Sequence, residues 1–288
     1  MNAPAEQQAV DRFELREIGG PSALGGGRRR FFDLLWLTSM TEFKLGYHGT
    51  ALGFLWSFVR PLLLFGVLLV VFTQIFRFGD DVKDYPAMLL FNIMLFTFFA
   101  DATGNAVTSV VRSENIVRKM QFPRLVIPLS VVITNALQLA LSLLVVFVFL
   151  LIYGVDPVWT WILTPLVIGA MVVLTTAAAM LLAVLYVRVR DVEIIWAVLS
   201  TLLFYATPVL YPIELAPAGF KEVIMLNPLS PIFEQAREWI IDPTAPGAVE
   251  AANGNGLLVL VPALIFVGVC AISVWAFNRG APRIAEEL

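Results

Sequence analysis

Six long apolar runs, separated by short polar segments, dominate the hydropathy pattern of this chain. A helix needs roughly 20 apolar residues to cross the hydrocarbon core of a bilayer, and every run meets this length except the fifth, which is short and ends in proline. The pattern therefore predicts an all-α integral membrane protein with six transmembrane helices. The predicted spans are residues 54–76, 85–111, 125–153, 158–187, 194–211 and 256–278.

The segment before the first span has a different pattern, with apolar residues on one helical face. Three arginines open residues 28–46, and a tryptophan lies within them, which is typical of an amphipathic helix lying in the headgroup layer. Acidic residues interrupt the apolar run, so a signal peptide is disfavoured. Residues 1–27 are polar and glycine-rich and predict a mobile cytoplasmic tail, which leaves 47–288 as the membrane domain. The shared face of the helix consists of Phe32, Leu35, Trp36, Ser39, Met40 and Phe43.

Residues 212–255, between the fifth and sixth spans, contain six prolines, which exclude one long helix. Two short apolar helices are predicted, at about 219–226 and 231–241, on either side of Asn227-Pro-Leu-Ser230. Their apolar content is too high for a solvent-exposed loop. We therefore expect an external re-entrant hairpin that enters the outer leaflet, provided that protein buries its turn.

The basic residues predict the orientation, because cytoplasmic loops of membrane proteins carry an excess of lysine and arginine. With six spans, fifteen of the 19 basic residues fall on the side of the termini, and both termini are therefore predicted to be cytoplasmic. These fifteen are Arg12, Arg16, Arg28, Arg29, Arg30, Lys44, Arg60, Arg112, Arg118, Lys119, Arg124, Arg188, Arg190, Arg279 and Arg283.

Composition excludes several classes of function. Hydrophobic residues make up 59% of the chain and charged residues 14%, which excludes a soluble domain. The single Cys270 and single His48 leave no disulfide framework and no cluster with metal-ligand spacing. The chain has no GxxxxGK[ST] phosphate loop and no Ser/His/Asp set suited to hydrolysis, so neither an ATPase site nor another enzyme activity is predicted.

A basic stretch, residues 112–124, separates the second and third spans. Ser113 and Glu114 suit the beginning of a short helix, and Phe122-Pro123 ends it, because the residue before proline avoids the helical region. Two interpretations are open: a positive loop lying on the lipid surface, or a lever that docks into a separate cytoplasmic protein. The stretch carries four basic residues, Arg112, Arg118, Lys119 and Arg124.

Several motifs, in order along residues 30–280, resemble the permease subunit of type 2 ABC exporters for polysaccharides (O-antigen, capsule and teichoic acid). One departure is His48, where this family more often has arginine or lysine. The motifs are Tyr47-His-Gly-Thr-Ala-Leu-Gly-Phe-Leu-Trp56 with Arg60-Pro-Leu62, Asn115-Ile-Val-Arg-Lys-Met-Gln-Phe-Pro-Arg124, Arg188-Val-Arg-Asp191, Thr207-Pro-Val-Leu-Tyr-Pro212 and Asn227-Pro-Leu-Ser-Pro231.

The resemblance implies half of a transporter in the bacterial inner membrane, surrounded by membrane lipid and paired with a second copy of itself. Two copies of a cytoplasmic ABC ATPase would carry ATP and Mg, and this chain would bind no cofactor and no nucleic acid. Residues 113–122 would form a coupling helix in a groove of the ATPase, and residues 31–45 would contact it too. The implied coupling residues are Glu114, Asn115, Arg118, Lys119, Phe122, Pro123 and Arg124.

The implied cargo is an undecaprenyl-linked, O-antigen-like glycan, moved outward at the expense of ATP. The alternatives are another cargo (capsule, teichoic acid, lipid or drug) or a secondary transporter, although the sequence has no inverted repeat. A membrane-embedded glycosyltransferase is a third class, and it would need outward-facing carboxylates with metal-binding spacing. The external carboxylates lack that spacing.

Aromatic and hydroxyl side chains recur on one face of the fifth span and suit a glycan, which has polar hydroxyls and weakly apolar ring faces. The resemblance also places the first and fifth spans at a central dimer interface. The alternative is ordinary packing against neighbouring spans. The predicted path residues are Trp56, Trp196, Ser200, Phe204, Thr207 and Tyr211.

Two polar features remain within the spans. Asp101 is the only clear carboxylate there, and it stands alone beside Thr103, Asn105 and Thr108. We interpret it as a hydrogen-bonded structural acid, with a proton relay as the alternative. Asn135, Gln138 and Ser142 form a polar seam on the third span, which predicts hydrogen bonding between helices.

Overall fold

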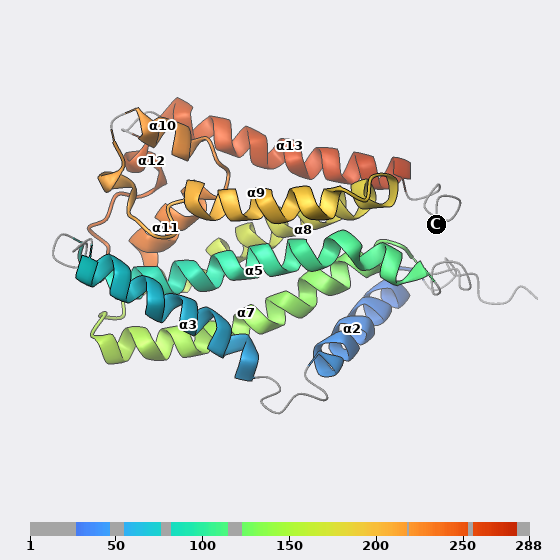
Figure 1. Ribbon diagram of the computed structural model, residues 1–288, viewed down its shortest axis with the longest axis horizontal. Helices are drawn as coiled ribbons and strands as arrows, with labels where there is room; N and C mark the ends of the chain where they lie inside the picture. The colour runs from blue at the N-terminus through green and yellow to red at the C-terminus, as the bar shows by residue number, and fades with distance from the viewer. Residues whose placement is uncertain are drawn as a thin grey trace, which may run out of the picture.

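The computed structural model describes residues 27–46, 55–75, 82–114, 123–217, 219–252 and 256–280. These residues form helices and connecting turns without any strand, which confirms the predicted all-α class. Long helices run side by side along the long axis of the molecule (Figure 1). The long elements are α2 (Gly27–Leu45), α3 (Trp56–Val70) with its π-helical continuation η2 (Val71–Ile75), α5 (Tyr85–Arg112), α7 (Val126–Tyr153), α8 (Thr164–Arg188), α9 (Val192–Ala206) and α13 (Gly256–Gly280).

Five helical stretches among the described residues are long and apolar enough to cross a membrane. The helix of the predicted fifth span, α9, is apolar but has only 15 residues. It ends at Ala206 and not at the predicted residue 211, because Pro208 forces Thr207 into an extended conformation. The five stretches are Phe58–Ile75, Tyr85–Arg112, Val126–Tyr153, Trp159–Arg188 and Leu258–Arg279.

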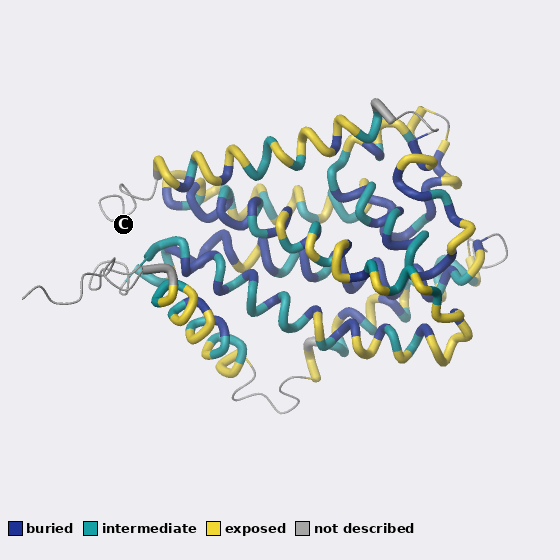
Figure 2. Tube along the Cα trace, turned by 180° about the vertical axis from the view of Figure 1, so that it is seen from behind, coloured by how far each residue is buried: buried dark blue, intermediate teal, exposed yellow. Residues whose placement is uncertain are grey.

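Helix α5 is the centre of the bundle and packs against α3, α7, α8 and α9. Most of its residues are buried, including the large side chains of Tyr85, Phe91 and Phe99. In Figure 2 the inner helices are dark blue, whereas the outer faces of the peripheral helices are yellow. The core of the molecule is therefore built around one helix, α5, of whose 28 residues 20 are buried.

Short elements cover the end of the bundle at which α5 begins (Figure 1). Asn227, in the turn between two of these short helices, donates a hydrogen bond to the Thr207 hydroxyl at 2.8 Å. The α5 side chains of Tyr85 and Asn92 donate to the carbonyls of Leu210 and Pro208, at 2.7 and 3.2 Å. Polar groups of the irregular backbone are thus bonded within the protein. The short elements are η3 (Trp159–Leu163), η4 (Ile213–Leu215), α10 (Phe220–Met225), α11 (Ser230–Ile240) and α12 (Ala248–Ala251).

A charged cluster lies beneath this cap, with Arg237 and Glu234 buried and Glu214 exposed at its edge. The Arg237 side chain is 7% exposed and donates to both carboxylate oxygens of Glu214, at 2.9 and 2.7 Å. Glu234 is 2% exposed, lies 3.8 Å from the same guanidinium and accepts a hydrogen bond from the Ile213 amide. Burial raises the pKa of Glu234 to about 8, Arg237 opposes this shift, and Glu214 adds to it. Burial thus outweighs the single cation and favours a proton on Glu234 at neutral pH.

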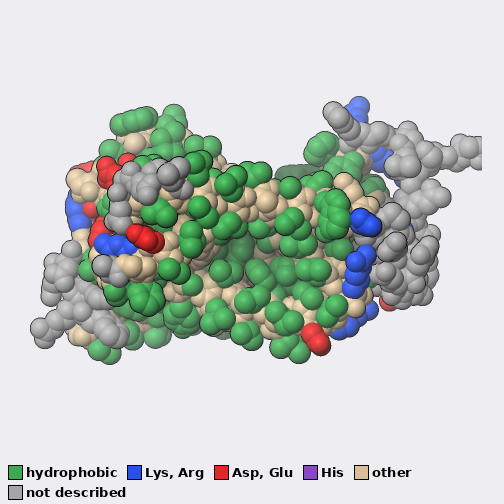
Figure 3. Space-filling model, turned by 90° about the horizontal axis from the view of Figure 1, so that it is seen from above, with side chains coloured by type: hydrophobic (Ala, Val, Ile, Leu, Met, Phe, Trp, Pro, Cys, Tyr) green, Lys and Arg blue, Asp and Glu red, His purple; other side chains and the backbone are tan. Residues whose placement is uncertain are grey.

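We call this capped end the α11 end and the opposite one, where α2 lies, the α2 end. Among the side chains that the structure describes, the α2 end carries eight Lys or Arg and five Asp or Glu. The α11 end carries three Lys or Arg and eight Asp or Glu. Figure 3 shows the belt of hydrophobic side chains between the two ends. The charge therefore differs in sign between the two ends of an apolar cylinder.

Candidate functional site

The predicted coupling turn connects the central helix α5 to α7 at the α2 end. Of the seven predicted coupling residues, Glu114, Pro123 and Arg124 are described, and Asn115, Arg118, Lys119 and Phe122 lie outside the described residues, as does most of the predicted helix 113–122. The Pro123 carbonyl accepts a hydrogen bond from the Val126 amide at 2.9 Å, where α7 begins. The turn is therefore attached at both ends to closely packed core helices. Its coupling role stays a prediction.

A second polar group lies at the same end, where α8 turns into α9. The Arg190 guanidinium lies over the Tyr186 ring, 5.1 Å from its centroid, and the Tyr186 hydroxyl donates to Glu193 at 3.1 Å. On α13, Arg279 lies over the Trp275 ring in the same way, at 5.4 Å. Such cation–π contacts hold long basic side chains at the boundary between the apolar belt and the charged end.

Helix α2 packs against the first half of α7. Leu35 and Ser39 are buried in this contact, and the Thr134 hydroxyl of α7 donates to the Ser39 carbonyl at 3.1 Å. Phe32 and Trp36 point outward, with 61% and 56% exposure. The predicted apolar face of α2 is therefore divided: part of it packs against α7, and part of it is exposed.

The predicted path residues of the fifth span lie against the protein's own helices. The Trp196 indole donates to the Thr103 hydroxyl at 3.0 Å, and its ring lies 6.0 Å from that of Phe99. The Phe204 ring meets Phe96 edge to face at 5.1 Å. These are the contacts that the packing alternative predicts, and the path assignment stays a prediction.

The remaining path residues have different surroundings. Ser200 is half-buried, Thr207 is fully buried beside Asn227, and the Tyr211 hydroxyl donates to the Tyr205 carbonyl at 3.2 Å. Trp56, at the start of α3, is 51% exposed and lies beside a cavity. The structure thus separates Trp56 from the stripe on α9.

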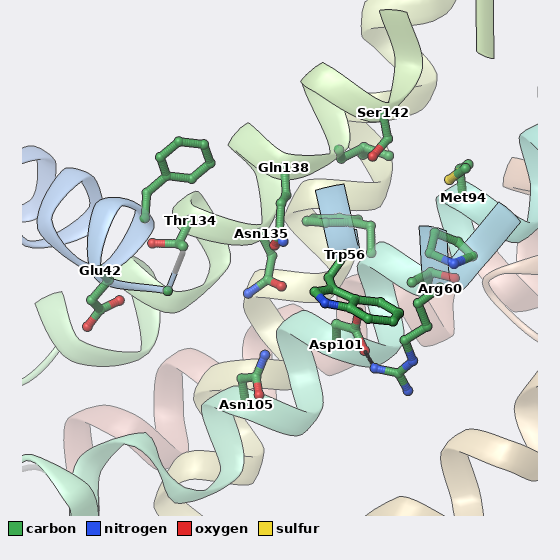
Figure 4. A pocket seen from close by; sticks show the side chains of 16 residues that line it. Glu42, Trp56, Arg60, Met94, Asp101, Asn105, Thr134, Asn135, Gln138 and Ser142 are labelled. Carbon is green, nitrogen blue, oxygen red and sulfur yellow. Dashed lines mark ion pairs between the residues drawn. The ribbon is translucent and has the colours of Figure 1, made fainter. Parts of the chain in front are cut away.

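This cavity, of about 550 Å³, lies between α2, α3, α5 and α7, and we call it the α5–α7 pocket. Figure 4 shows Trp56, Arg60 and Asp101 together on one side of the pocket, and Thr134, Asn135, Gln138 and Ser142 along α7 on the other. The pocket residues used below are Glu42, Phe43, Gly46, Trp56, Arg60, Thr97, Asp101, Asn105, Thr134, Asn135, Gln138 and Ser142.

Asp101 does not stand alone in the structure, contrary to its interpretation from the sequence. A guanidinium nitrogen of Arg60 lies 3.9 Å from one of its carboxylate oxygens (Figure 4). The neighbouring Thr103 hydroxyl instead donates to the Phe99 carbonyl within α5. Pairing with a cation from another helix lowers the cost of a carboxylate at this depth.

The pocket was not predicted from the sequence, although its polar seam on α7 was. Asn135, Gln138 and Ser142, which the sequence predicts to bond helices together, all lie on the wall of the pocket, and their bonding between helices stays a prediction. At the rim, the Ser130 hydroxyl donates to Glu42 of α2 at 3.3 Å. Burial raises the pKa of Glu42 above its ordinary value, and hydrogen bonds from Ser130 and Thr134 partly offset this effect. Two features of the sequence could have indicated the pocket: the polar seam on the third span and the presence of Arg60 and Asp101 within the first and second spans.

The part of the chain that the structure describes contains no candidate metal site. No group of three or more His, Cys, Asp or Glu side chains is arranged there to hold an ion. The pocket instead brings amide, hydroxyl and charged side chains together around one cavity.

The family match and the similar proteins all belong to membrane transport. The family described as ABC-2 type transporter matches residues 33–241. An O-antigen export system permease protein, RfbA, from Klebsiella pneumoniae is 30% identical over 89% of this chain and 95% of its own length. The RfbA protein of Myxococcus xanthus is 29% identical over 86% of this chain and 92% of its own length. The polysialic acid transport protein KpsM of Escherichia coli is 20% identical over 80% of this chain and 88% of its own length.

Proposed function

The chain belongs to the ABC-2 type transporter family and is a permease component of an exporter of this kind, and we propose that its cargo is a lipid-linked, O-antigen-like polysaccharide. The observation that carries this proposal is the match over nearly the whole length of permeases named for O-antigen export. The family implies an ABC ATPase subunit as partner. We propose that two permeases and two ATPases assemble, and that ATP hydrolysis on the ATPase drives export.

The proposed topology has six spans in the bacterial inner membrane, with the short α9 as the fifth and both termini in the cytoplasm. The excess of basic side chains at the α2 end supports this orientation. The hairpin of α10 and α11 would then be external and re-entrant. Its support is the bond from Asn227 to Thr207, which covers the polar turn with protein.

The proposed second copy would cover exposed apolar faces of α3 and α9. None of the residues of α9 is buried in one chain. On both helices, large apolar side chains are more than half exposed, among them Leu63 and Val67 on α3 and Ile194 and Leu202 on α9. Exposure of this extent suits either lipid or another copy, and the first and fifth spans are those that the family resemblance places at the dimer interface. The glycan path would lie between the two copies.

The ATPase is proposed to dock at the α2 end through the turn between α5 and α7. The turn is attached to the most buried helix, so a force on it reaches the core directly. Among the described side chains, this end is also richer in basic than in acidic residues. These features support docking over simple contact with lipid.

The test is to reverse the charges of Arg118 and Lys119 together, and separately to replace Phe122 by alanine. Truncating a docking anchor costs about 2 kcal/mol or more, which weakens the complex about thirtyfold. We expect normal insertion of the permease, with loss of copurified ATPase and of glycan export in cells.

The matched control is Arg279→Glu, which reverses a charge at the same end but on α13. It should leave copurification and export near normal. Normal copurification and export in both coupling variants would overturn the docking proposal.

A second cargo, a capsular polysaccharide, is favoured by the likeness to the polysialic acid transport protein. The two proposals differ in what accumulates when the chain is deleted. Cytoplasmic O-antigen on its carrier supports the first, and cytoplasmic capsular polymer supports the second.

A further inference from the structure

We propose that the α5–α7 pocket binds the headgroup of a phosphorylated glycolipid, holding its phosphate and its first sugar in the leaflet that contacts α2. This inference rests on the proposed function, since it assigns a reception site for the proposed cargo. It is distinct from the predicted path on α9, whose residues do not line the pocket.

The cation of the site is Arg60. Its side chain is 80% exposed although it lies on a helix within a candidate span. The 3.9 Å separation from Asp101 is an ion pair without a hydrogen bond, since such bonds are shorter than about 3.2 Å. The guanidinium can therefore take a phosphate, for which its planar set of donors is well suited, without first breaking a tight pair.

The wall opposite Arg60 suits hydroxyl groups. Thr134, Asn135, Gln138 and Ser142 present amides and hydroxyls from a single face of α7, and Thr97 and Asn105 add to them from α5. Uncharged polar side chains within spans bond to neighbouring helices or line a cavity, and these six line the pocket. Amides both donate and accept hydrogen bonds, as the hydroxyls of a sugar require.

The carboxylates distinguish a sugar from a bare phosphate. Asp101 and Glu42 both line the pocket, and an ionised carboxylate only accepts hydrogen bonds. Each of these carboxylates can accept a hydrogen bond from a sugar hydroxyl. A ligand that presents several sugar hydroxyls beside its phosphate region therefore gains contacts that a ligand without a sugar lacks.

Trp56 supplies the aromatic surface. Its ring lies beside Arg60 and Asp101 (Figure 4), where it can cover the weakly apolar face of a sugar. The indole is 51% exposed, so a surface for stacking is present. The volume of about 550 Å³ is within the range of small-molecule sites, roughly 300–1,000 Å³.

The position of the pocket suits entry from the membrane surface. Glu42 and Phe43 of α2 and the adjoining Gly46 form its rim, and α2 is the helix predicted to lie in the headgroup layer. A lipid in this leaflet can keep its chain in the hydrocarbon while its headgroup passes the rim. The site would thus select the cargo before it reaches the path.

The test uses the full permease–ATPase complex in nanodiscs, with binding measured by native mass spectrometry and by competition with a radiolabelled probe. The probe is a farnesyl diphosphate that carries one hexose. The comparison ligands are sugar-free farnesyl diphosphate, phosphatidylglycerol and phosphatidylethanolamine. We expect the probe to bind at least tenfold more tightly than each of the three.

Two variants separate the parts of the site. Arg60→Gln should weaken both farnesyl diphosphates about tenfold or more, because it removes the phosphate contact. Gln138→Leu should weaken the hexose probe about tenfold and leave the sugar-free compound unchanged, because the proposal places this amide against the sugar and not against the phosphate. The matched control is Arg279→Gln, since Arg279 also neighbours a tryptophan but lines no part of this pocket.

Equal binding of the hexose probe and the sugar-free compound would overturn the sugar part of the proposal, and tight binding of phosphatidylglycerol would make this a general phospholipid site. Unchanged binding in both variants would overturn the site itself. These failures are separable from failure of the proposed function. If the permease copurifies with its ATPase and exports glycan but its pocket does not bind the probe, the inference alone is overturned. If the pocket binds the probe but the permease neither copurifies with an ATPase nor exports glycan, the proposed function alone is overturned.

Discussion

Helices α5 and α9 pack against each other, yet they have opposite surroundings. Of the 28 residues of α5, 20 are buried, whereas none of the 15 residues of α9 is. The buried helix is the more polar one, since it carries Asn92, Asp101 and Asn105 among its apolar residues. In lipid there is no gain in hiding apolar surface, and helices associate through close packing and polar contacts. Which of these two helices is buried therefore depends more on polar contacts and close packing than on the hydrophobicity of its residues.

The few contacts of α9 show the same rule. A hydrogen bond joins Trp196 to Thr103, and an aromatic contact joins Phe204 to Phe96. Apolar side chains such as Ile194, Val198 and Leu202 remain exposed. A helix held by few contacts and exposed over most of its surface suits a surface against which a second copy moves.

The largest effect is expected in the core of α5. Phe91 is fully buried, so Phe91→Ala should lower the free energy of unfolding by about 3–5 kcal/mol. The matched change on α9 is Leu202→Ala, where the side chain is 58% exposed and the loss should be far smaller. Membrane abundance and thermal unfolding in detergent measure both. Equal losses would show that α9 is as firmly packed as α5.

The buried cluster at the α11 end should come next. Arg237→Met leaves Glu214 and Glu234 without their cation, and breaking a buried ion pair costs about 3–5 kcal/mol before relaxation. Because Glu234 can take up a proton, the measured loss should fall toward the lower part of this range. Thermal unfolding reports it, with Lys221→Met on α10 as the control. An unchanged melting temperature would contradict an electrostatic role for the cluster.

Phe204→Ala should have an intermediate effect that decides between packing and path. Loss of its edge-to-face contact with Phe96 costs about 0.5–1.5 kcal/mol beyond the buried area. If packing is its role, abundance and export should fall in proportion. If it lines the path, export should fall while abundance and ATPase activity stay near normal. Glycan export per unit of inserted permease separates the two results.

A further prediction is a dependence of stability on pH. The pKa of Glu234 is raised to about 8 from an ordinary value of 4.5, so the folded protein holds this proton more tightly than the unfolded chain does. The resulting stability is fully present below about pH 4.5 and is lost as the pH rises through about 8. The melting temperature should therefore fall over this interval, and Glu234→Gln should flatten the decline. The same decline in the variant would assign it to other groups.

The extent of several elements was predictable because they depend on local pattern. The second span was predicted at 85–111 and α5 covers Tyr85–Arg112, and the third was predicted at 125–153 and α7 covers Val126–Tyr153. The fourth was predicted as one unit from 158, but the chain forms the 3₁₀ turn η3 first and α8 begins at Thr164, with Pro165 in its first turn. Proline is favoured there because its missing N–H is not needed at a helix start.

The candidate site was less predictable. The polar seam of α7 is visible in the sequence, but the same seam suits helix-to-helix bonding and the wall of a cavity equally well. The ion pair of Arg60 and Asp101 joins α3 and α5, and local sequence patterns do not predict how two helices are rotated relative to each other. The stripe on α9 was visible as well, but its direction toward α5 depends on how the two helices pack.

The sequence by itself determined the class of the protein, the apolar belt and the difference in charge between its ends, because hydropathy and charge act locally along each segment. Only the tertiary structure decided that α5 is enclosed, that α9 is exposed and that four helices leave a polar cavity around Arg60 and Asp101. In a bilayer nearly every span is apolar, so composition does not distinguish a central helix from a peripheral one. That distinction comes from shape complementarity and polar bonds between helices, and these arise when the helices pack together.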